Sequence, residues 1–339
     1  MGIGIAIVGA TGNVGREMLN VLDESDISIE QVFAVASNKS KGKTVTFGRK
    51  NLTVEDLSEF DFSKVDIALF SAGGTIAEKY APLAAKENCI VIDNSSRFRM
   101  DDDVPLVVPE VNVDAIKGYK KRNIIANPNC STIQMVVALH PLRQLANITR
   151  IVVSTYNSTS GAGKEAMDEL FQQTKGIFSN NEIEPKIFQK QIAFNVIPQI
   201  GAFDDNGYSE EENKMINETK KILSSEIEVT ATCVRVPTFI GHAESVNVEF
   251  DKPISIENAI EVLKKSPGCE VQNYKANDYI TPIDCVGDDM TFISRIRKDE
   301  SVDNALNLWV VSDNLRKGAA LNTVQIAELI VQKYSNYLH

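Results

Sequence analysis

The residue best suited to chemistry in this sequence is a cysteine that lies between a strand pattern and a helix pattern. Cys130 belongs to the segment NPNCST at residues 127–132, with an apolar strand pattern at 123–126 and a helix pattern at 133–145. The proline favours a turn, and a hydroxyl residue after Cys130 can cap the helix. The sulfur would then lie at the positive end of the helix dipole, where a thiolate nucleophile is stabilised. The same segment also fits a small buried thiol, and nothing within it decides between the two.

A thiolate nucleophile needs a group that exchanges protons with the substrate, and histidine titrates closest to neutral pH. The sequence holds three histidines. His140 precedes a proline inside the helix pattern, which is typical of a structural residue, and His339 is the final residue. His242 lies in the Pro/Gly-containing segment 235–244 between two strand patterns, and loops often carry functional residues. Elimination makes His242 the expected acid or base, with a plain surface histidine as the alternative.

The first residues of the chain have the pattern of a nucleotide-binding turn. An apolar, β-branched strand pattern at 3–8 runs directly into Gly9, Gly12 and Gly15, and a helix pattern follows. Strand, glycine turn and helix in this order let the backbone approach a pyrophosphate at a helix N-terminus. The spacing is GxxGxxG, which differs from the GxGxxG form. The alternative is a glycine turn with a purely structural role.

The end of the next strand pattern, residues 32–36, bears on which dinucleotide would bind. An NAD site usually has an acidic residue there to hold the ribose hydroxyls. This chain has Ser37, Asn38 and Lys39, followed by more lysines. Hydroxyls and lysines suit a ribose 2′-phosphate, so the segment favours NADP, unless it is a solvated basic loop. A further strand pattern at 66–70 ends in the sequence SAGG, a second turn suited to a closely approaching cofactor.

The remaining patterns predict two domains. Strand patterns at 90–92, 106–110 and 124–126 alternate with helices, which implies a Rossmann-like, doubly wound parallel sheet with ligands at the carboxyl ends of its strands. Beyond 145 the strands are longer and alternate with polar residues, which indicates an α+β domain with a mixed sheet. We expect residues 1–129 to bind the dinucleotide, completed by a C-terminal helix at 317–339, and residues 130–316 to form the second domain. The second domain's strands are expected at 151–156, 228–236, 245–250, 290–297 and 305–312, with helices at 164–178, 209–224 and 256–265.

Composition narrows the classes of function. The formal net charge of −11 disfavours general binding to nucleic acid or anionic membranes. No apolar run approaches the roughly 18 residues of a membrane helix, and the N-terminus lacks a signal-peptide pattern. The five cysteines are scattered and odd in number, without a CxxC pair. We therefore expect no metal site and no disulfide framework, and a reduced cytoplasmic protein.

Several motifs together resemble the bacterial branch of the aspartate-semialdehyde dehydrogenase family. The resemblance runs through nearly the whole chain, and the combination is specific although no single motif is. The motifs are GATGNVG at 9–15, NSS at 94–96 with Arg99, PLVVPEVN at 105–112, NPNCST at 127–132, SGAG at 160–163, RVP at 235–237 with His242, AALN at 319–322 and QIAE at 325–328.

The resemblance implies a reaction. L-aspartyl 4-phosphate would be reduced by NADPH to L-aspartate 4-semialdehyde and phosphate, on the route to lysine, threonine and methionine. The Cys130 thiolate would expel phosphate to form a thioester, hydride would reduce the thioester, and His242 would be the acid or base. Dividing the reaction in this way replaces one difficult step with easier ones. The resemblance also implies a homodimer, with 130–316 as the catalytic and dimerisation domain.

The resemblance assigns roles to further residues. Arg235 would hold the substrate carboxylate and Glu212 its ammonium group, while Arg99 and Lys214 would hold the phosphate. Asn94, Asn129 and Asn157 would line the site. No metal is implied. The residues expected to contact NADP are Gly9, Thr11, Gly12, Asn13, Val14, Ser37, Asn38, Lys39, Ser71, Gly73, Ser160, Gly161 and Asn322.

Three positions depart from the family pattern. Asn157 stands where the family commonly has glutamine, and its side chain is one methylene shorter. Arg97 replaces a small residue, so the phosphate pocket is more basic or Arg97 points outward. Asn38 stands where arginine is frequent. Two rival functions remain open: an N-acetyl-γ-glutamyl-phosphate reductase, whose acylated substrate amine gives Glu212 nothing to pair with, and a catalytically idle NADP-binding sensor.

Overall fold

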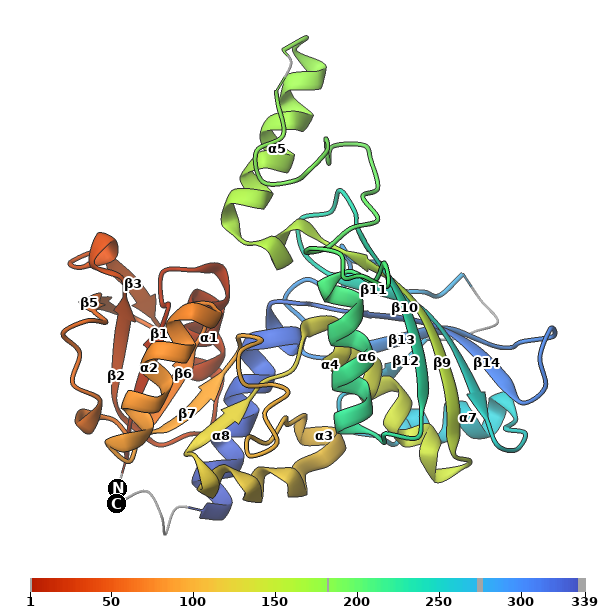
Figure 1. Ribbon diagram of the computed structural model, residues 1–339, viewed down its shortest axis with the longest axis horizontal. Helices are drawn as coiled ribbons and strands as arrows, with labels where there is room; N and C mark the ends of the chain where they lie inside the picture. Colours follow the sequence, from red (N-terminus) through yellow and green to blue (C-terminus); the bar gives the residue numbers. More distant parts are fainter. Residues whose placement is uncertain (1, 182, 273–276, 335–339) are drawn as a thin grey trace. The chain divides into compact units, whose positions relative to one another are not determined.

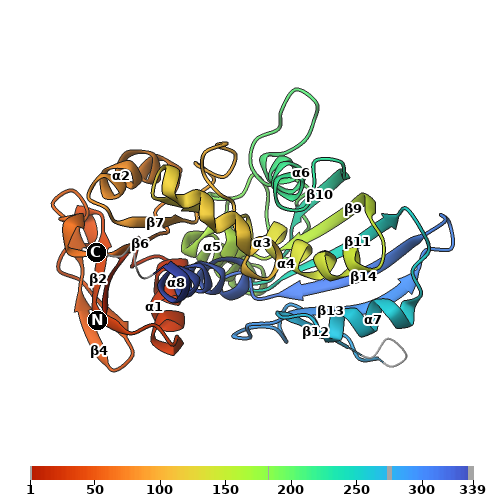
Figure 2. The ribbon, with the colours of Figure 1, turned by 90° about the horizontal axis from the view of Figure 1, so that it is seen from below.

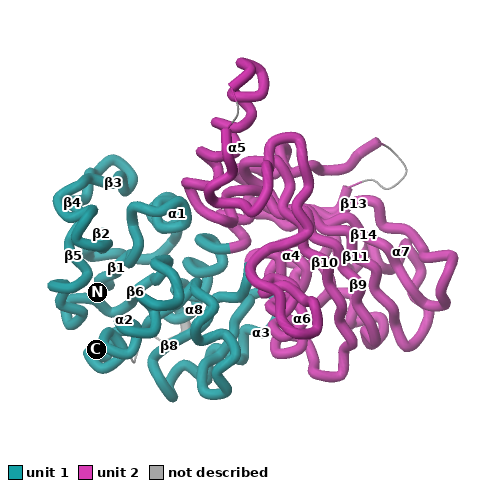
Figure 3. Tube along the Cα trace, turned by 45° about the horizontal axis from the view of Figure 1, so that its top comes forward, with its two compact units in different colours: residues 1–129, 319–339 teal, residues 130–318 magenta. Residues whose placement is uncertain are grey.

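The computed structural model describes residues 2–181, 183–272 and 277–334 (Figure 1). The described residues form two compact units, which Figure 3 shows in different colours. Unit 1 comprises those of residues 1–129 and 319–339, and unit 2 comprises those of residues 130–318. The last five residues of the helix expected at 317–339, among them His339, lie outside the described residues.

Unit 1 has the architecture expected from alternating strands and helices. Its strands are β1 (Ile3–Val8), β2 (Ile29–Ala36), β3 (Thr44–Phe47), β4 (Lys50–Thr53), β5 (Glu55–Asp56), β6 (Ile67–Phe70), β7 (Ile90–Asp93) and β8 (Ile124–Ala126). Its helices are α1 (Asn13–Glu24), α2 (Gly74–Lys86), α3 (Pro109–Asn112) and α8 (Leu321–Tyr334). Six strands form one parallel sheet in the order β5-β2-β1-β6-β7-β8. β3 and β4 form a separate antiparallel pair.

Helices cover both faces of this sheet. α1 and α8 contact each other on one face, and α2 packs on the other (Figure 2). Burial on both faces explains why the inner strands are short, continuous apolar runs. The hydrophobic core of unit 1 takes residues from both ends of its sequence, including Ile5 and Ile7 of β1 and Val324 and Ile330 of α8.

The strand expected at 106–110 is wrong. Only an isolated bridge joins Leu106 to Ala126, and α3 begins at Pro109. Proline has no backbone N–H to donate to a neighbouring strand, and its fixed φ suits the first turn of a helix. The side chain of Asn112 then takes up backbone groups that a neighbouring strand would otherwise pair. Its Oδ1 accepts from Val108 N at 2.8 Å, and its Nδ2 donates to the Leu106 carbonyl at 2.8 Å.

Unit 2 contains the mixed sheet that the second half of the sequence predicts. Its strands are β9 (Ile148–Asn157), β10 (Glu228–Arg235), β11 (His242–Phe250), β12 (Cys269–Val271), β13 (Thr291–Lys298) and β14 (Ala305–Ser312). Its helices are α4 (Cys130–Leu139), α5 (Lys164–Phe178), α6 (Glu210–Ile222) and α7 (Ile256–Lys264). Short 3-10 helices include Thr159–Ala162, and a π-helical turn, Arg316–Ala320, precedes α8.

The sheet of unit 2 has the order β10-β9-β11-β14-β13-β12. Its outer pairs are parallel and its central pairs antiparallel. α4, α6 and α7 pack on one face, which we call the inner face. The fold class expected from the sequence, a parallel doubly wound sheet plus an α+β domain with a mixed sheet, is confirmed. None of the described helices is long and apolar enough to cross a membrane.

Candidate active site

Cys130 is the first residue of α4, directly after the turn that leaves β8. α4 is apolar and buried almost throughout, so its starting point is fixed by packing. Gly318 lies against the cysteine, because a Cβ at that position would be 2.7 Å from the Cβ of Cys130. Only glycine allows the chain to pass so close to the sulfur-bearing residue.

Cys130 differs from the other cysteines in exposure and charge. It is partly exposed, whereas the other four cysteines are buried. Burial raises the pKa of the Cys89 and Cys233 thiols and raises that of Cys285 to about 12. Cys130 lies at the N-terminus of α4, and its thiolate form interacts favourably with the positive guanidinium of Arg235. These surroundings favour a thiolate at Cys130 and at none of the three raised thiols.

Arg235 ends β10 on the inner face of the sheet and is buried. Its backbone is paired in both directions with Ile197, at 2.8 and 3.0 Å. Its Nη1 donates to the Ser158 carbonyl at 2.7 Å. Burial lowers the pKa of Arg235, while the Glu211 carboxylate favours its charged form. The guanidinium is therefore held rigidly as a planar donor suited to a carboxylate.

Glu211 of α6 connects the other polar groups of this region. One carboxylate oxygen pairs with Lys214 Nζ at 3.1 Å, and the other accepts from Asn157 Nδ2 at 3.4 Å. Asn157 Nδ2 also donates to Ser131 Oγ at 3.2 Å. Asn157 is 1% exposed, and no group in the described chain is within hydrogen-bonding range of its Oδ1. A buried acceptor of this kind is typical of a site that a ligand donor completes.

The Glu212 carboxylate, which the family resemblance assigns to the substrate ammonium group, is bound inside the fold. The Glu212 carboxylate accepts from the backbone N–H of Ser209 at 2.7 Å, as part of a capping box, and from that of Cys233 at 2.9 Å. Both oxygens are thus used inside the fold. Adjacent residues on an α-helix point about 100° apart, so only one of the two glutamates can face Arg235.

His242 begins β11 and is fully buried. Its Nδ1 lies 3.1 Å from Ser158 N and 3.0 Å from Ser158 Oγ. Gly161 lies beside Nε2: a Cβ there would be 3.2 Å from Nε2 and 3.0 Å from Arg235 Nη1. Burial and the Arg235 charge lower the pKa of His242 to about 3. The imidazole is therefore neutral at physiological pH.

Glu244 lies two residues further along β11, with its side chain on the same inner face. It is fully buried, and within the described part of the chain neither carboxyl oxygen has a hydrogen-bond partner in range. Burial raises its pKa well above the usual range, and the neighbouring Gln134 only partly offsets this effect. Glu244 is therefore a neutral carboxylic acid in the folded protein.

A separate cavity of about 460 Å³ lies in unit 1 at the carboxyl ends of β1, β2 and β6. Gly9 has a φ of +92°, and a Cβ on Gly15 would lie 2.2 Å from the Gly9 carbonyl oxygen, so this turn requires both glycines. Gly12 caps α1 without a side-chain hydrogen bond, which leaves backbone donors for a phosphate. This geometry fits a dinucleotide. The residues lining the cavity include Gly9, Thr11, Gly12, Ser37, Asn38, Asp56, Ser71 and Tyr80.

Comparison with known proteins agrees with both units. Residues 4–119 match a family model described as semialdehyde dehydrogenase, NAD binding domain, and residues 139–317 match one described as semialdehyde dehydrogenase, dimerisation domain. An aspartate-semialdehyde dehydrogenase from Aquifex aeolicus is 53% identical over 338 residues, which is 98% of this chain and 99% of the relative. This chain belongs to the aspartate-semialdehyde dehydrogenase family.

Solved structures of this family superpose closely on the chain. Aspartate semialdehyde dehydrogenase II from Vibrio cholerae, described as complexed with ASA, is 50% identical with a TM-score of 0.97 and covers 98% of this chain and 99% of its own. The Candida albicans aspartate semialdehyde dehydrogenase, described with NADP, is 25% identical with a TM-score of 0.76, and the match covers 99% and 100% of the two chains.

Each of the two units contains some of the expected site residues. Unit 2 brings together Cys130, Asn157, Lys214, Arg235 and His242, with Ser160 and Gly161 beside them. Arg99 lies in unit 1, where its Nε donates to the Asn127 carbonyl at 2.9 Å and its Nη2 to the Asn94 carbonyl at 2.7 Å. Asn129 is buried next to Cys130 in sequence.

Three residues named in the sequence analysis lack the surroundings that direct contact with the cofactor or the substrate phosphate would require. Asn322 is fully buried, and its amide donates to Val107 O and Asn127 Oδ1, so it supports the turn before Cys130. Lys39 is exposed and does not line the cavity. Arg97 pairs with Glu78 at 2.9 Å and Asp101 at 3.5 Å. This pairing favours the alternative in which Arg97 points outward.

One residue of this region has no signal in the local sequence. Asn314 follows β14 and is 3% exposed. Its Oδ1 accepts from Gly241 N at 2.9 Å and from the hydroxyls of Ser158 and Ser160 at 3.1 Å each. It therefore joins three segments around His242, which no pattern within residues 312–316 indicates.

Proposed function

We propose that this chain reduces L-aspartyl 4-phosphate to L-aspartate 4-semialdehyde with NADPH, releasing phosphate, in the biosynthesis of lysine, threonine and methionine. The observation that carries the proposal is the partly exposed Cys130 at a helix N-terminus, in the same unit as buried Arg235, Glu211 and His242. Two opposite charges and a nucleophile suit a small amino acid with an activated carboxyl group. The 53% identity with the Aquifex aeolicus enzyme supports the same assignment.

The first chemical step uses Cys130. The thiolate attacks the acyl phosphate carbon, the bond to the phosphate oxygen breaks, and its electron pair leaves with phosphate. Arg99 and Lys214 are proposed to hold that phosphate. The product is a thioester on Cys130, which divides the reaction into two easier steps. NADPH, when bound, supplies the hydride that reduces the thioester.

Substrate recognition follows from charge. The Arg235 guanidinium can bind the α-carboxylate with two parallel N–H donors. Glu211 can accept from the α-ammonium group, and Asn157 Oδ1 adds a buried acceptor. Glu211 therefore takes the role expected for Glu212. An N-acetylated substrate would bury this carboxylate against a neutral amide, which is costly for a charged group.

NADP is the proposed cofactor. Its pyrophosphate would lie at the N-terminus of α1, against Gly9, Thr11 and Gly12, with Asn13 and Val14 in the first turn. Ser37 and Asn38 line the same cavity and are proposed to face the ribose phosphate. Asp56 also lines it, but its carboxylate already accepts from Asn38 at 2.6 Å and from Ser58. Ser71 and Gly73 complete the proposed contacts in unit 1.

The reverse reaction provides the test. The purified protein is incubated with L-aspartate 4-semialdehyde, phosphate and NADP, and NADPH is followed by its absorbance. We expect NADPH formation that requires phosphate, with a preference for this substrate over N-acetyl-glutamate 5-semialdehyde of roughly 10³-fold or more, since the acylated amine leaves Glu211 unpaired. Turnover without phosphate, or equal turnover of both aldehydes, would contradict the proposal.

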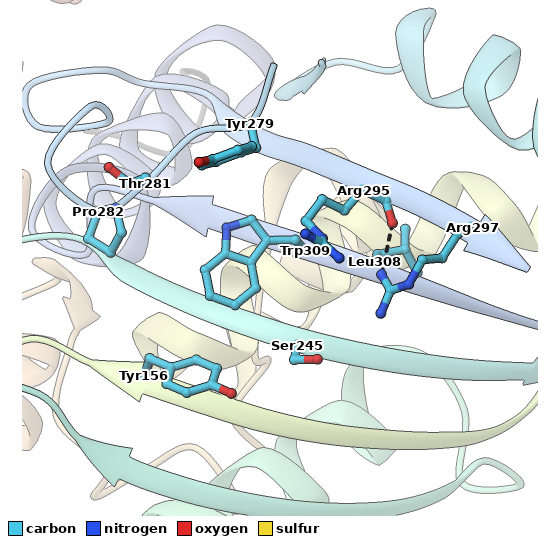
Figure 4. A pocket seen from close by; sticks show the side chains of 9 residues that line it. All are labelled: Tyr156, Ser245, Tyr279, Thr281, Pro282, Arg295, Arg297, Leu308 and Trp309. Atoms are coloured by element: carbon cyan, nitrogen blue, oxygen red, sulfur yellow. Dashed lines mark hydrogen bonds between the residues drawn. The ribbon is translucent and has the colours of Figure 1, made fainter. Parts of the chain in front are cut away.

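We further propose that two copies associate through the outer face of the unit 2 sheet, opposite α4, α6 and α7. The match to a dimerisation domain supports association through unit 2. A hollow of about 370 Å³ lies on this face, and Figure 4 shows Tyr156, Trp309, Arg295 and Ser245 around it. Half-buried aromatic side chains and arginine are enriched in protein interfaces. The protein is proposed to act in the cytoplasm, where a reducing environment keeps its cysteines as thiols.

Ser245→Arg is expected to weaken this dimer. Ser245 lies in the middle of the outer face, where a long charged side chain from each copy would prevent close packing. Sedimentation velocity should show a shift from dimer to monomer. Glu257→Arg on α7, also a change to arginine but at an exposed helix position, should leave the sedimentation coefficient unchanged. An unchanged dimer in the Ser245 variant would place the interface elsewhere.

A further inference from the structure

The helix that begins at Cys130 carries a buried amide in an otherwise apolar stretch. After Thr132, Gln134 is the single polar side chain of α4, and it is fully buried. Taking an amide out of water costs free energy unless hydrogen bonds replace the lost water. A methionine would fill the same space without that cost. The contacts of Gln134 therefore need an explanation.

The Gln134 amide connects α4 to two central strands of the unit 2 sheet. Its Oε1 accepts from Ser312 Oγ at 2.9 Å, and its Nε2 donates to the His242 carbonyl at 3.4 Å. His242 and Ser312 are paired in register, where β11 begins and β14 ends. Glu244, two residues further along β11, also lies beside the amide. One side chain therefore holds the helix to the strand ends around His242.

Cys130 and Gln134 lie on the same side of α4. Four residues correspond to about 400° of helix, so the two side chains differ by about 40° in direction and by about 6 Å along the axis. If α4 turned by about 15°, a side-chain atom about 5 Å from its axis would move by about 1.3 Å. Ser131 links the first turn to Asn157 of β9 at 3.2 Å. Gln134 supplies the corresponding link to β11, so it fixes how Cys130 faces the strand of His242.

A buried glutamine can also serve the fold alone, and Gln173 of α5 is such a residue. It is 2% exposed, and its Oε1 accepts from the backbone N–H groups of Ile192 at 2.8 Å and Ala193 at 3.1 Å. Loss of that acceptor would leave two backbone donors unpaired, which is costly. Gln134 instead binds a serine hydroxyl and, at long range, a carbonyl. It therefore contributes less to stability than Gln173, and its main effect is on position.

We propose that Gln134 is a positioning residue for the proposed reaction: it joins α4 to the ends of β11 and β14 and so sets where the Cys130 sulfur lies relative to the His242 ring. This inference rests on the proposed function, in which His242 is the acid or base. Nucleophile and acid or base come from different elements and must reach one substrate together. An offset of about 1 Å can lower the rate about 100-fold, while Arg235 and Glu211 still bind the substrate.

Gln134→Met tests this role. Methionine has a similar length and packs well in a core, but it can form neither hydrogen bond. In the reverse assay we expect kcat to fall by about 10- to 100-fold, with less than about a 3-fold change in KM for L-aspartate 4-semialdehyde. The midpoint of thermal unfolding should stay the same or rise, because an apolar side chain replaces a buried amide.

Gln173→Met is the matched control, since it makes the same change at another buried glutamine of unit 2. It should show the opposite result: kcat near the wild-type value and a lower unfolding midpoint, because two backbone N–H groups lose their acceptor. Wild-type kcat in Gln134→Met, or a loss of kcat that only follows a loss of stability, would overturn the proposal.

A double-mutant cycle tests the link itself. Ser312→Ala removes the partner of the Gln134 Oε1 and should also lower kcat. Combined with Gln134→Met, it should lower kcat no further than Gln134→Met does alone, because both changes break one connection. Fully additive losses would mean that the two residues act separately, which contradicts the proposed link.

Alkylation of Cys130 by iodoacetamide keeps this inference separate from the proposed function, since it needs no substrate. At pH 7 the rate in Gln134→Met should fall by about 3-fold or more, because the sulfur shifts relative to the Arg235 guanidinium that favours the thiolate. Gln173→Met should react at the wild-type rate. A slower Gln134→Met supports the positioning role even if the reverse assay shows no phosphate-dependent turnover. An unchanged alkylation rate would overturn the positioning role and leave the proposed reaction intact.

Discussion

Replacing Cys130 with alanine is expected to lower kcat by roughly 10⁴-fold or more while the protein keeps its fold. The reaction loses its covalent intermediate, and the remaining groups can bind substrate but cannot form a thioester. Removing the sulfur should cost little stability, because Cys130 is partly exposed and touches Gly318 through its Cβ, which alanine retains. Steady-state kinetics and thermal unfolding of the variant measure the two effects.

Cys89→Ala is the matched control for this variant. Cys89 is buried in unit 1 and burial raises its thiol pKa, so its removal should leave kcat near the wild-type value. Alkylation with iodoacetamide adds an independent readout, since mass spectrometry should find Cys130 modified well before the four buried thiols. Residual phosphate-dependent turnover in Cys130→Ala, or faster labelling of another cysteine, would reject Cys130 as the nucleophile.

Glu244→Gln is expected to make the protein more stable than the wild type, by an amount that grows with pH. Burial raises the pKa of native Glu244 above the value of about 4.5 that it has when unfolded. The native state then holds a proton that the unfolded chain has released, so wild-type stability falls as pH rises from about 4.5 toward the native pKa. The loss is about 1.4 kcal/mol for each pH unit in this window. Glutamine resembles the neutral acid but cannot ionise, so the variant avoids this loss of stability.

Urea unfolding of both proteins at about pH 5, 7 and 9 measures this effect as a difference. His242, whose native pKa is lowered to about 3, contributes stability that is lost as pH falls from 6.5 toward 3, and this contribution cancels between the two proteins. Glu249→Gln, on the same strand but paired with Arg150 at the surface, is the control and should not reproduce this gain in stability. A flat difference for Glu244→Gln would mean that its carboxylate is ionised in the native protein.

The sequence was informative where the determinants are local. Apolar runs, the Pro128 turn and a cappable helix start predict the junction that places Cys130, and strand–glycine–helix predicts the cavity at Gly9. Elimination among three histidines leads to His242, which the structure buries at the start of β11. The junction at Cys130 and the turn at Gly9 each depend on residues within about ten positions, which is the range over which periodicity and turn chemistry act.

The errors arose where neighbouring residues compete or where distant segments meet. Glu211 and Glu212 are adjacent and differ only in the direction in which their side chains leave the helix. The capping-box pattern Ser209-x-x-Glu212 was the available signal that Glu212 caps α6, which leaves Glu211 for the site. The strand expected at 106–110 ignored the prolines on both sides of its centre. Asn314 acts on Ser158, more than 150 positions earlier in the chain, and one sequence carries no record of that contact.

The way the chain passes between its units has a consequence for synthesis on the ribosome. Unit 2 is one continuous stretch, 130–318, whereas the core of unit 1 also needs Val324, Ile326 and Ile330 of α8. A nascent chain therefore makes most of unit 1 first but can finish its core only after all of unit 2 has emerged. The nucleotide-binding sheet would wait, with the part of one face that α8 covers still exposed, while the later unit folds. Chaperone demand should consequently peak for the N-terminal unit, the reverse of the usual order in which early domains fold early.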